Sequence, residues 1–141
     1  KVTPIWNGPG TVKLTILDSN YEKASNVLIE KVQNEMLKFE LSHHRKPCVA
    51  MMGLAFKPNI DDLRESPAKY IVTKVMQSCN NANILVVEPN IESHNVFKLT
   101  DYKEAYNKAD IVVMLVAHDS FKTLPYSDNK VILDFCGIYK R

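Results

Sequence analysis

The sequence predicts an α/β fold, namely a half-Rossmann, doubly wound and mainly parallel sheet that is preceded by a long connecting helix. Short apolar runs without a helical charge pattern alternate with segments whose apolar residues recur every three to four positions. Strands that alternate with helices pair in parallel through right-handed crossovers. The chain has 141 residues, of which 45% are hydrophobic and 24% are charged, so it is long enough for one domain with its own core.

Charge and hydropathy argue against two classes of protein. The 18 basic and 16 acidic residues are spread along the chain and give a net charge of +2, which does not indicate a dedicated nucleic-acid surface. No stretch approaches the roughly 20 apolar residues that cross a bilayer. The chain begins at Lys1 without a signal-peptide segment, so we expect a fragment of a longer protein that is not directed to the secretory route.

Cysteine and histidine spacing predicts no bound metal. Cys48, Cys79 and Cys136 are odd in number and lack Cys-x-x-Cys spacing, which suggests neither a disulfide framework nor a zinc site and fits a reducing cytoplasm. Cys48 and Cys79 fall on apolar faces of expected elements, where cysteine is usually an unreactive hydrophobe. His43 and His44 are adjacent, so their side chains point in different directions, and no acidic or thiol ligand lies at a useful spacing.

The chain divides into three expected parts. Residues 1–20 form an irregular N-terminal segment by their Pro and Gly content, although Thr11 to Leu17 allows a short strand or a helix. Residues 21–46 hold a long helix and the basic link that ends it. The helix runs from Tyr21 to about Leu41, with apolar residues at three-to-four spacing: Ala24, Val27, Leu28, Val32, Met36, Leu37 and Leu41. Residues 47–141 form the α/β domain.

Within this domain the apolar runs and breakers place each element. Ser66 is a helix cap and Pro67 the first helical residue, where its missing N–H has no cost. The expected strands are Cys48 to Ala55, Ile84 to Val87, Asp110 to Val116 and Val131 to Phe135, and the expected helices are Ala68 to Cys79 and Tyr102 to Ala109.

The stretch from Gly53 to Ala68, GLAFKPNIDDLRESPA, is the candidate ligand site. It connects a buried strand to a helix start and contains five charged residues: Lys57, Asp61, Asp62, Arg64 and Glu65. Open α/β sheets bind ligands at the carboxyl ends of strands, beside helix N-termini. The alternative is a solvated loop whose charges pair with one another.

Two other strand exits face the same edge by topology. Glu88 to Ile91, Glu-Pro-Asn-Ile, follows the second strand, where a carboxylate commonly bonds ribose hydroxyls, but the first turn lacks the G-x-G-x-x-G dinucleotide fingerprint. His118 follows the third strand and is either a base or, more simply, a local hydrogen-bonding residue.

The Gly-x-Ala-Phe-Lys run, its Asp-rich turn and the Arg-Glu-Ser that follows resemble the nucleotide-binding C-terminal domain of the UDP-glucose/GDP-mannose dehydrogenase family. LVVEPNI and DIVVMLVAH extend the resemblance over Val49 to Gly137 and bring it nearest to the UDP-N-acetyl-D-mannosamine dehydrogenase branch. The resemblance implies a full-length cytoplasmic enzyme that oxidises the C6 alcohol of a UDP-sugar in two NAD-dependent steps on a catalytic cysteine. It places that cysteine and the main NAD-binding domain upstream, and makes the long helix part of a central region that supports a homodimer.

The same resemblance assigns roles to three loop residues. Phe56 and Lys57 would bind the nucleotide sugar, and Arg64 would reach toward the NAD held by the other domain, the alternative for Arg64 being an ion pair with Asp61 or Asp62. No catalytic residue is expected in this chain. The family usually has a basic residue where Cys136 stands, and this departure leaves open a second hypothesis, a non-catalytic nucleotide-binding or dimerisation module of the same fold.

Overall fold

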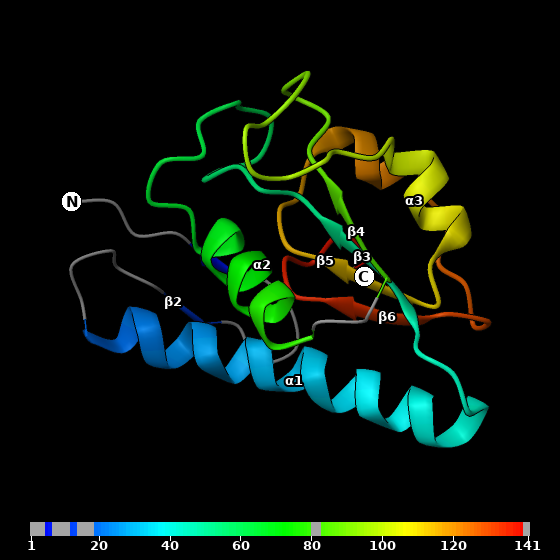
Figure 1. The fold of residues 1–141 in the computed structure, drawn as a ribbon. Helices are drawn as coiled ribbons and strands as arrows, with labels where there is room; N and C mark the ends of the chain where they lie inside the picture. The colour runs from blue at the N-terminus through cyan, green and yellow to red at the C-terminus, as the bar shows by residue number, and fades with distance from the viewer. Residues whose placement is uncertain (1–4, 7–11, 14–18, 80–82, 140–141) are drawn as a thin grey trace.

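The computed structural model describes residues 5–6, 12–13, 19–79 and 83–139 (Figure 1). Near the N-terminus, β1 (Ile5–Trp6) pairs antiparallel with β2 (Val12–Lys13). For the segment from Thr11 to Leu17 we expected either a short strand or a helix. The structure describes only β2 in this segment, and the other residues lie outside the described ranges. The long helix α1 spans Ser19–His43 and begins slightly before its expected start.

The α/β prediction is confirmed by a four-stranded, all-parallel sheet in the order β4-β3-β5-β6. The strands are β3 (Cys48–Met52), β4 (Asn83–Val87), β5 (Ile111–Met114) and β6 (Val131–Asp134). Met52 pairs with both Val87 and Met114, and Met114 pairs with Asp134. All four carboxyl ends therefore meet at one edge of the sheet, and the loops that leave this edge are neighbours in space.

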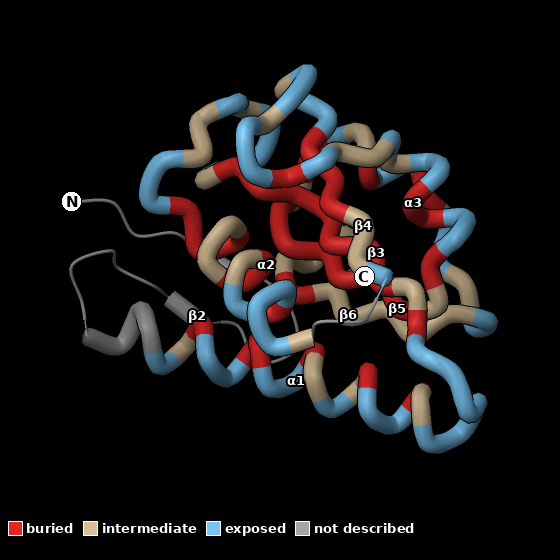
Figure 2. Tube along the Cα trace, in the orientation of Figure 1, coloured by how far each residue is buried: buried red, intermediate tan, exposed pale blue. Residues whose placement is uncertain are grey.

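Helices cover both faces of the sheet. α1 and α2 (Pro67–Ser78) pack on one face, while α3 (Tyr102–Lys108) and the 3-10 helix η1 (Asp119–Thr123) pack on the other. Alternate strand residues point to opposite faces. Val49 and Met51 join the core beneath α1 and α2, whereas Ala50 and Met52 join the core beneath α3 and η1. The central strands are consequently buried on both sides (Figure 2).

α1 buries one side only. Its core positions are Leu28, Val32, Met36 and Phe39, which belong to the same cluster as the strand residues, together with Ile29. Three of the apolar positions in the expected stripe lie outside this contact: Val27, Leu37 and Leu41 are 49%, 56% and 68% exposed. No helix among the described residues is long and apolar enough to cross a membrane.

β3 ends at Met52, earlier than the expected end at Ala55, because Gly53 leaves the extended conformation with φ of 110°. Its N–H still donates to Val87 O (2.9 Å). A Cβ at Gly53 would lie 2.7 Å from the Cβ of Val116, so both the dihedral and the close approach require glycine. Residues 53–55 therefore begin the loop toward α2 instead of extending the strand.

Candidate functional site

The candidate site is built by three loops at the carboxyl edge of the sheet: residues 53–66 after β3, residues 88–91 after β4 and residues 115–119 after β5. They lie at the same end of the sheet in Figure 1. Two backbone bonds hold the third loop to the end of β3, where the first loop begins, since Leu115 N and Val116 N both donate to Met52 O at 3.0 and 3.3 Å. The topology thus brings together the three strand exits that the sequence singled out.

Glu88 lies beneath these loops with a fully buried side chain. Its Oε1 accepts from Leu54 N (2.9 Å) and Ala55 N (3.0 Å), and its Oε2 accepts from Asn90 N (2.9 Å). Burial by itself raises the pKa of Glu88, but the hydrogen bonds from His118 and the backbone outweigh it and leave the pKa below its ordinary value. The carboxylate is therefore charged and occupied internally, and it does not offer a free acceptor for a ribose hydroxyl.

His118 is 1% exposed and contacts Glu88 through Nε2 at 2.9 Å. Its Nδ1 accepts from the backbone N–H of Asn59 at 2.8 Å and lies 3.3 Å from Nδ2 of Asn90. The ring edge packs on Phe121, with centroids 5.3 Å apart. Of the two roles considered for His118, the structure shows the local hydrogen-bonding one.

The loop after β3 is fixed at several further points. Phe56 N donates to Asp62 O (2.8 Å), which closes the loop on itself, and Ser66 Oγ donates to Ala55 O (3.3 Å). Asn90 Nδ2 donates to Ile60 O (3.0 Å), and Asp119 N donates to Asn59 Oδ1 (2.8 Å). The backbone of this loop is thus held by hydrogen bonds to both neighbouring loops.

Phe56 and Lys57 lie on this loop. Phe56 is half-buried and Lys57 is exposed, with its Nζ 6.0 Å from the centre of the Phe56 ring. Within the described part of the chain, Lys57 forms no ion pair. An aromatic face beside an unpaired ammonium suits a ligand that combines a base with phosphate oxygens.

Arg64 forms an ion pair with Asp62, which is the alternative that we considered to a contact with NAD. Its Nε and Nη2 lie 3.0 and 2.9 Å from Oδ1 and Oδ2 of Asp62, respectively. Hydrogen bonding to Arg64 lowers the pKa of Asp62 to about 2. The Arg64 side chain is nevertheless 88% exposed to solvent. Its contact with NAD stays a prediction.

Cys136 follows β6 and packs into the core beneath α3. Burial raises the pKa of its thiol well above the ordinary value, with the nearby Asp134 carboxylate adding to the effect. Asp134 accepts from Gly137 N, Ile138 N and Tyr139 N at 2.8 to 3.0 Å. The thiol is thus a packed, protonated group, and it does not supply the positive charge that the resemblance led us to expect at this position.

The residues that sequence reasoning missed are Asn59 and Asn90, which hold the loops together through backbone and side-chain bonds. Asn59 has φ of 63°, and Asn after Pro is a turn signal that predicts such a dihedral but no partner. Among the described residues, no group of three or more His, Cys, Asp or Glu side chains is arranged to hold a metal ion.

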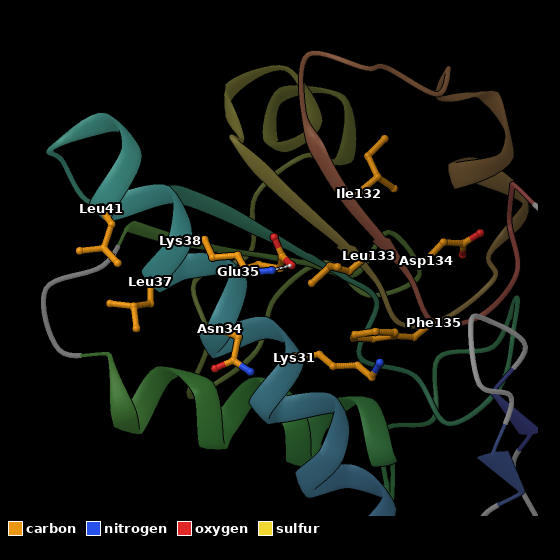
Figure 3. A pocket seen from close by; sticks show the side chains of 10 residues that line it. All are labelled: Lys31, Asn34, Glu35, Leu37, Lys38, Leu41, Ile132, Leu133, Asp134 and Phe135. Atoms are coloured by element: carbon orange, nitrogen blue, oxygen red, sulfur yellow. Dashed lines mark hydrogen bonds and ion pairs between the residues drawn. The ribbon is translucent and has the colours of Figure 1, made fainter.

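A cavity of about 490 Å³ lies away from these loops, between α1 and β6 (Figure 3). Leu37 and Leu41 contribute from α1, and Leu133 and Phe135 from β6 and the residue after it, with the Lys38–Glu35 ion pair (3.5 Å) at its wall. It contains none of Phe56, Lys57 and Arg64. Nothing in the sequence pattern predicted it, because its two walls are far apart in the chain.

Comparison with known proteins relates this geometry to a family. Residues 50–141 match the profile described as UDP-glucose/GDP-mannose dehydrogenase family, UDP binding domain. A UDP-N-acetyl-D-mannosamine dehydrogenase of Campylobacter jejuni is 37% identical over 94% of this chain and 32% of its own length. An NDP-N-acetyl-D-galactosaminuronic acid dehydrogenase of Ralstonia solanacearum is 41% identical over 67% of this chain and 24% of its own.

Solved structures share the fold. A UDP-D-ManNAc dehydrogenase of Pyrococcus horikoshii superposes with a TM-score of 0.63 at 23% identity, over 82% of this chain and 28% of that one. A second profile, the Baseplate J-like central domain, matches residues 1–54, which is well under half of the chain and supports no functional assignment. The chain spans about a third or less of the length of these curated relatives. The chain belongs to the UDP-glucose/GDP-mannose dehydrogenase family, and residues 50–141 match its UDP-binding domain.

Proposed function

We propose that this chain is the nucleotide-binding C-terminal domain of an NAD-dependent UDP-sugar 6-dehydrogenase. The enzyme would convert UDP-N-acetylmannosamine to UDP-N-acetylmannosaminuronate in the cytoplasm of a bacterium, for surface or capsular polysaccharide synthesis. The observation that carries the proposal is the match of residues 50–141 to the UDP-binding profile, together with an exposed, unpaired Lys57 at the carboxyl edge of a parallel sheet.

The chemistry of the loop supports the substrate half of this proposal. Phe56 supplies an apolar ring surface for the uracil base or the sugar, and Lys57 donates charge-assisted hydrogen bonds to diphosphate or hydroxyl oxygens. The loop beneath them is held in one conformation by Glu88 and His118, so little ordering would be required on binding.

The described residues do not form a dinucleotide site by themselves. Glu88, the carboxylate at the position of a ribose partner, is buried and saturated with hydrogen bonds. Arg64, which the resemblance assigns to NAD, is 88% exposed although its Nε and Nη2 pair with Asp62. We therefore propose that NAD, which accepts hydride in this family, is held mainly by another domain, and that the 141-residue chain alone is inactive.

The proposed enzyme is a homodimer. α1 supports this assignment because it leaves Val27, Leu37 and Leu41 between 49% and 68% exposed along one side, and exposed apolar patches commonly mark protein interfaces. The alternative function, a non-catalytic nucleotide-binding or dimerisation module, is favoured by one observation: Cys136 is a packed, uncharged residue where the family has a basic one.

Titrating the 141-residue chain with UDP by calorimetry tests the binding function. Lys57→Ala should weaken UDP binding by about ten- to a hundredfold, which corresponds to the loss of one charge-assisted contact of about 1.5 to 3 kcal/mol. Lys108→Ala is the matched control, because Lys108 is exposed at the end of α3, on the opposite edge of the sheet. Equal affinity of the Lys57→Ala and wild-type chains would remove Lys57 from the site.

In the complete enzyme the two cations should separate by ligand. Lys57→Ala should raise the Michaelis constant of the UDP-sugar, and Arg64→Ala that of NAD, because Arg64 stands at the other end of the loop from Lys57 and its side chain is exposed. Steady-state kinetics with each substrate varied in turn measures this. If both variants impair the same ligand equally, Arg64 serves only the ion pair with Asp62.

A further inference from the structure

We propose that His118 and Glu88 are positioning residues for the nucleotide site: they touch no ligand, and they set the backbone of residues 54–59, which carries Phe56 and Lys57. This inference rests on the proposed function for its ligand. Its geometric basis does not depend on that function. Glu88 follows β4 and His118 follows β5, and this buried pair accepts hydrogen bonds from the backbone of the loop after β3.

The pair is shielded from solvent. The side chains of His118 and Glu88 are 1% and 0% exposed. Among the described residues, the side-chain hydrogen bonds of Glu88 go to the 54–55 backbone, to Asn90 N and to His118. A packed apolar pair would fill the same volume without the cost of desolvating a carboxylate, so what this pair adds is a defined backbone position rather than packing alone.

The proton on His118 is fixed by its neighbours. Asn59 N–H is a donor only, so Nδ1 must accept from it at 2.8 Å. Asn90 Nδ2, also a donor, lies 3.3 Å from the same nitrogen. In the neutral ring the proton is then on Nε2, from which it donates to Glu88 Oε1 at 2.9 Å. Asn59 N–H therefore donates to the imidazole, and the imidazole donates to the carboxylate.

Phe56 and Lys57 lie between two points at which the buried pair holds the loop. Glu88 holds Leu54 and Ala55 on one side, and His118 holds Asn59 on the other. Loss of the Asn59 N–H bond would leave this donor unpaired and would loosen the end of the loop nearer to Lys57, although Asp119 N still donates to Asn59 Oδ1 (2.8 Å). Ligand binding would then have to order the loop again, which lowers the affinity. Affinity for UDP should therefore depend on a histidine that UDP does not contact.

Two variants of His118 separate its bonds. Asn carries an amide oxygen near the place of Nδ1, so His118→Asn keeps an acceptor for Asn59 N–H but does not reach Glu88. Gln carries an amide nitrogen near the place of Nε2, so His118→Gln keeps a donor to Glu88 and leaves Asn59 N–H unpaired. Asp110→Asn is the control: it weakens the Arg45 pair (3.0 Å) at the opposite edge of the sheet and tests the effect of lower stability alone.

Each chain is studied by amide hydrogen exchange, urea unfolding and calorimetric titration with UDP. We expect His118→Gln to speed exchange at Asn59 and to weaken UDP binding by about tenfold or more, and His118→Asn to stay within about threefold of wild type on both. Asp110→Asn should keep wild-type affinity at reduced stability. The inference is overturned if His118→Gln binds UDP as tightly as wild type, or if all three variants weaken binding in proportion to lost stability.

Failure of the function gives a different result. A wild-type chain that does not bind UDP contradicts the proposed function, and the positioning device is then judged on Asn59 exchange alone: it stands if only His118→Gln speeds exchange and falls if the variants behave alike. One readout needs no variant. The imidazole nitrogen shifts of the wild-type chain should show the proton of His118 on Nε2, and a proton on Nδ1 overturns the inference.

Discussion

Glu88 is a single residue whose charge state links the site loop to the stability of the fold. Its carboxylate is buried and accepts hydrogen bonds from Leu54, Ala55, Asn90 and His118. Its ordinary pKa is 4.5, and these bonds lower the folded value despite burial. A group with a lowered folded pKa stabilises the folded state above its unfolded pKa, and that contribution is lost as the pH falls through the folded value.

Glu88→Gln should therefore lower the free energy of unfolding at neutral pH by about 1.5 to 3 kcal/mol, since hydrogen bonds to a charged group are lost. The difference from wild type should shrink as the pH falls below 4.5, where the unfolded wild-type side chain takes up a proton. Urea unfolding of both chains at a series of pH values measures this. A difference that stays constant or grows toward acid pH contradicts the assignment.

Cys136 should be unreactive in the folded chain. Burial raises the pKa of its thiol, and the thiolate is the form that alkylating reagents attack. With iodoacetamide at about pH 8, labelling followed by mass spectrometry should be slow at Cys136 in the native state and fast in urea. Rapid native labelling would show an activated thiol and reopen a catalytic role for this chain.

Single residues also show where sequence reasoning succeeds and stops. Lys57 and Arg64 were identifiable because they are charged residues in a strand-to-helix loop, and the ion pair of Arg64 with Asp62 was one of the alternatives. The bond from Asn59 to His118 was not predictable, because it joins residues 59 positions apart. Whether a carboxylate such as Glu88 faces a ligand or the core depends on such distant contacts.

At the scale of elements, the local signals were most reliable where one residue has a clear local role. Ser66 caps α2 by accepting from Lys69 N (3.2 Å), and Pro67 is the first helical residue, as the sequence predicted. The end of β3 was misplaced because apolarity continues through Leu54 and Ala55, which are buried without being in the strand. Apolar runs report burial, while the positive φ of Gly53 decides the end of the strand.

The cap of α2 also reaches the site loop. Ser66 Oγ donates to Ala55 O (3.3 Å) while it caps the helix. Ser66→Ala should cost about 1 kcal/mol or more of stability, because the cap is lost and Ala55 O loses a buried donor. Thermal or urea unfolding measures the loss, and Ser66→Thr, which keeps the hydroxyl, is the comparison. An unchanged midpoint in Ser66→Ala would exclude the double role.

At the scale of the molecule, the two faces of the sheet differ in how they are closed. One face packs beneath α3 and η1, and the other beneath α2 and the buried side of α1. The overall α/β class followed from alternating periods along the chain, but the cavity between α1 and β6 did not. The molecule therefore offers two candidate places for a ligand: the loops at the carboxyl edge, and this cavity on the side of the long helix.

A titration of the isotope-labelled chain with UDP, followed by backbone amide NMR, distinguishes the two places directly. We expect the largest shift changes to fall on Phe56, Lys57 and their neighbours in residues 54–59, with smaller changes at the 88–91 and 115–119 loops. The residues within 31–41 and 132–135 that line the cavity should not respond. Changes concentrated in those residues, or no change at UDP concentrations in the millimolar range (about 1 mM or more), would contradict the assignment of the carboxyl edge as the UDP site.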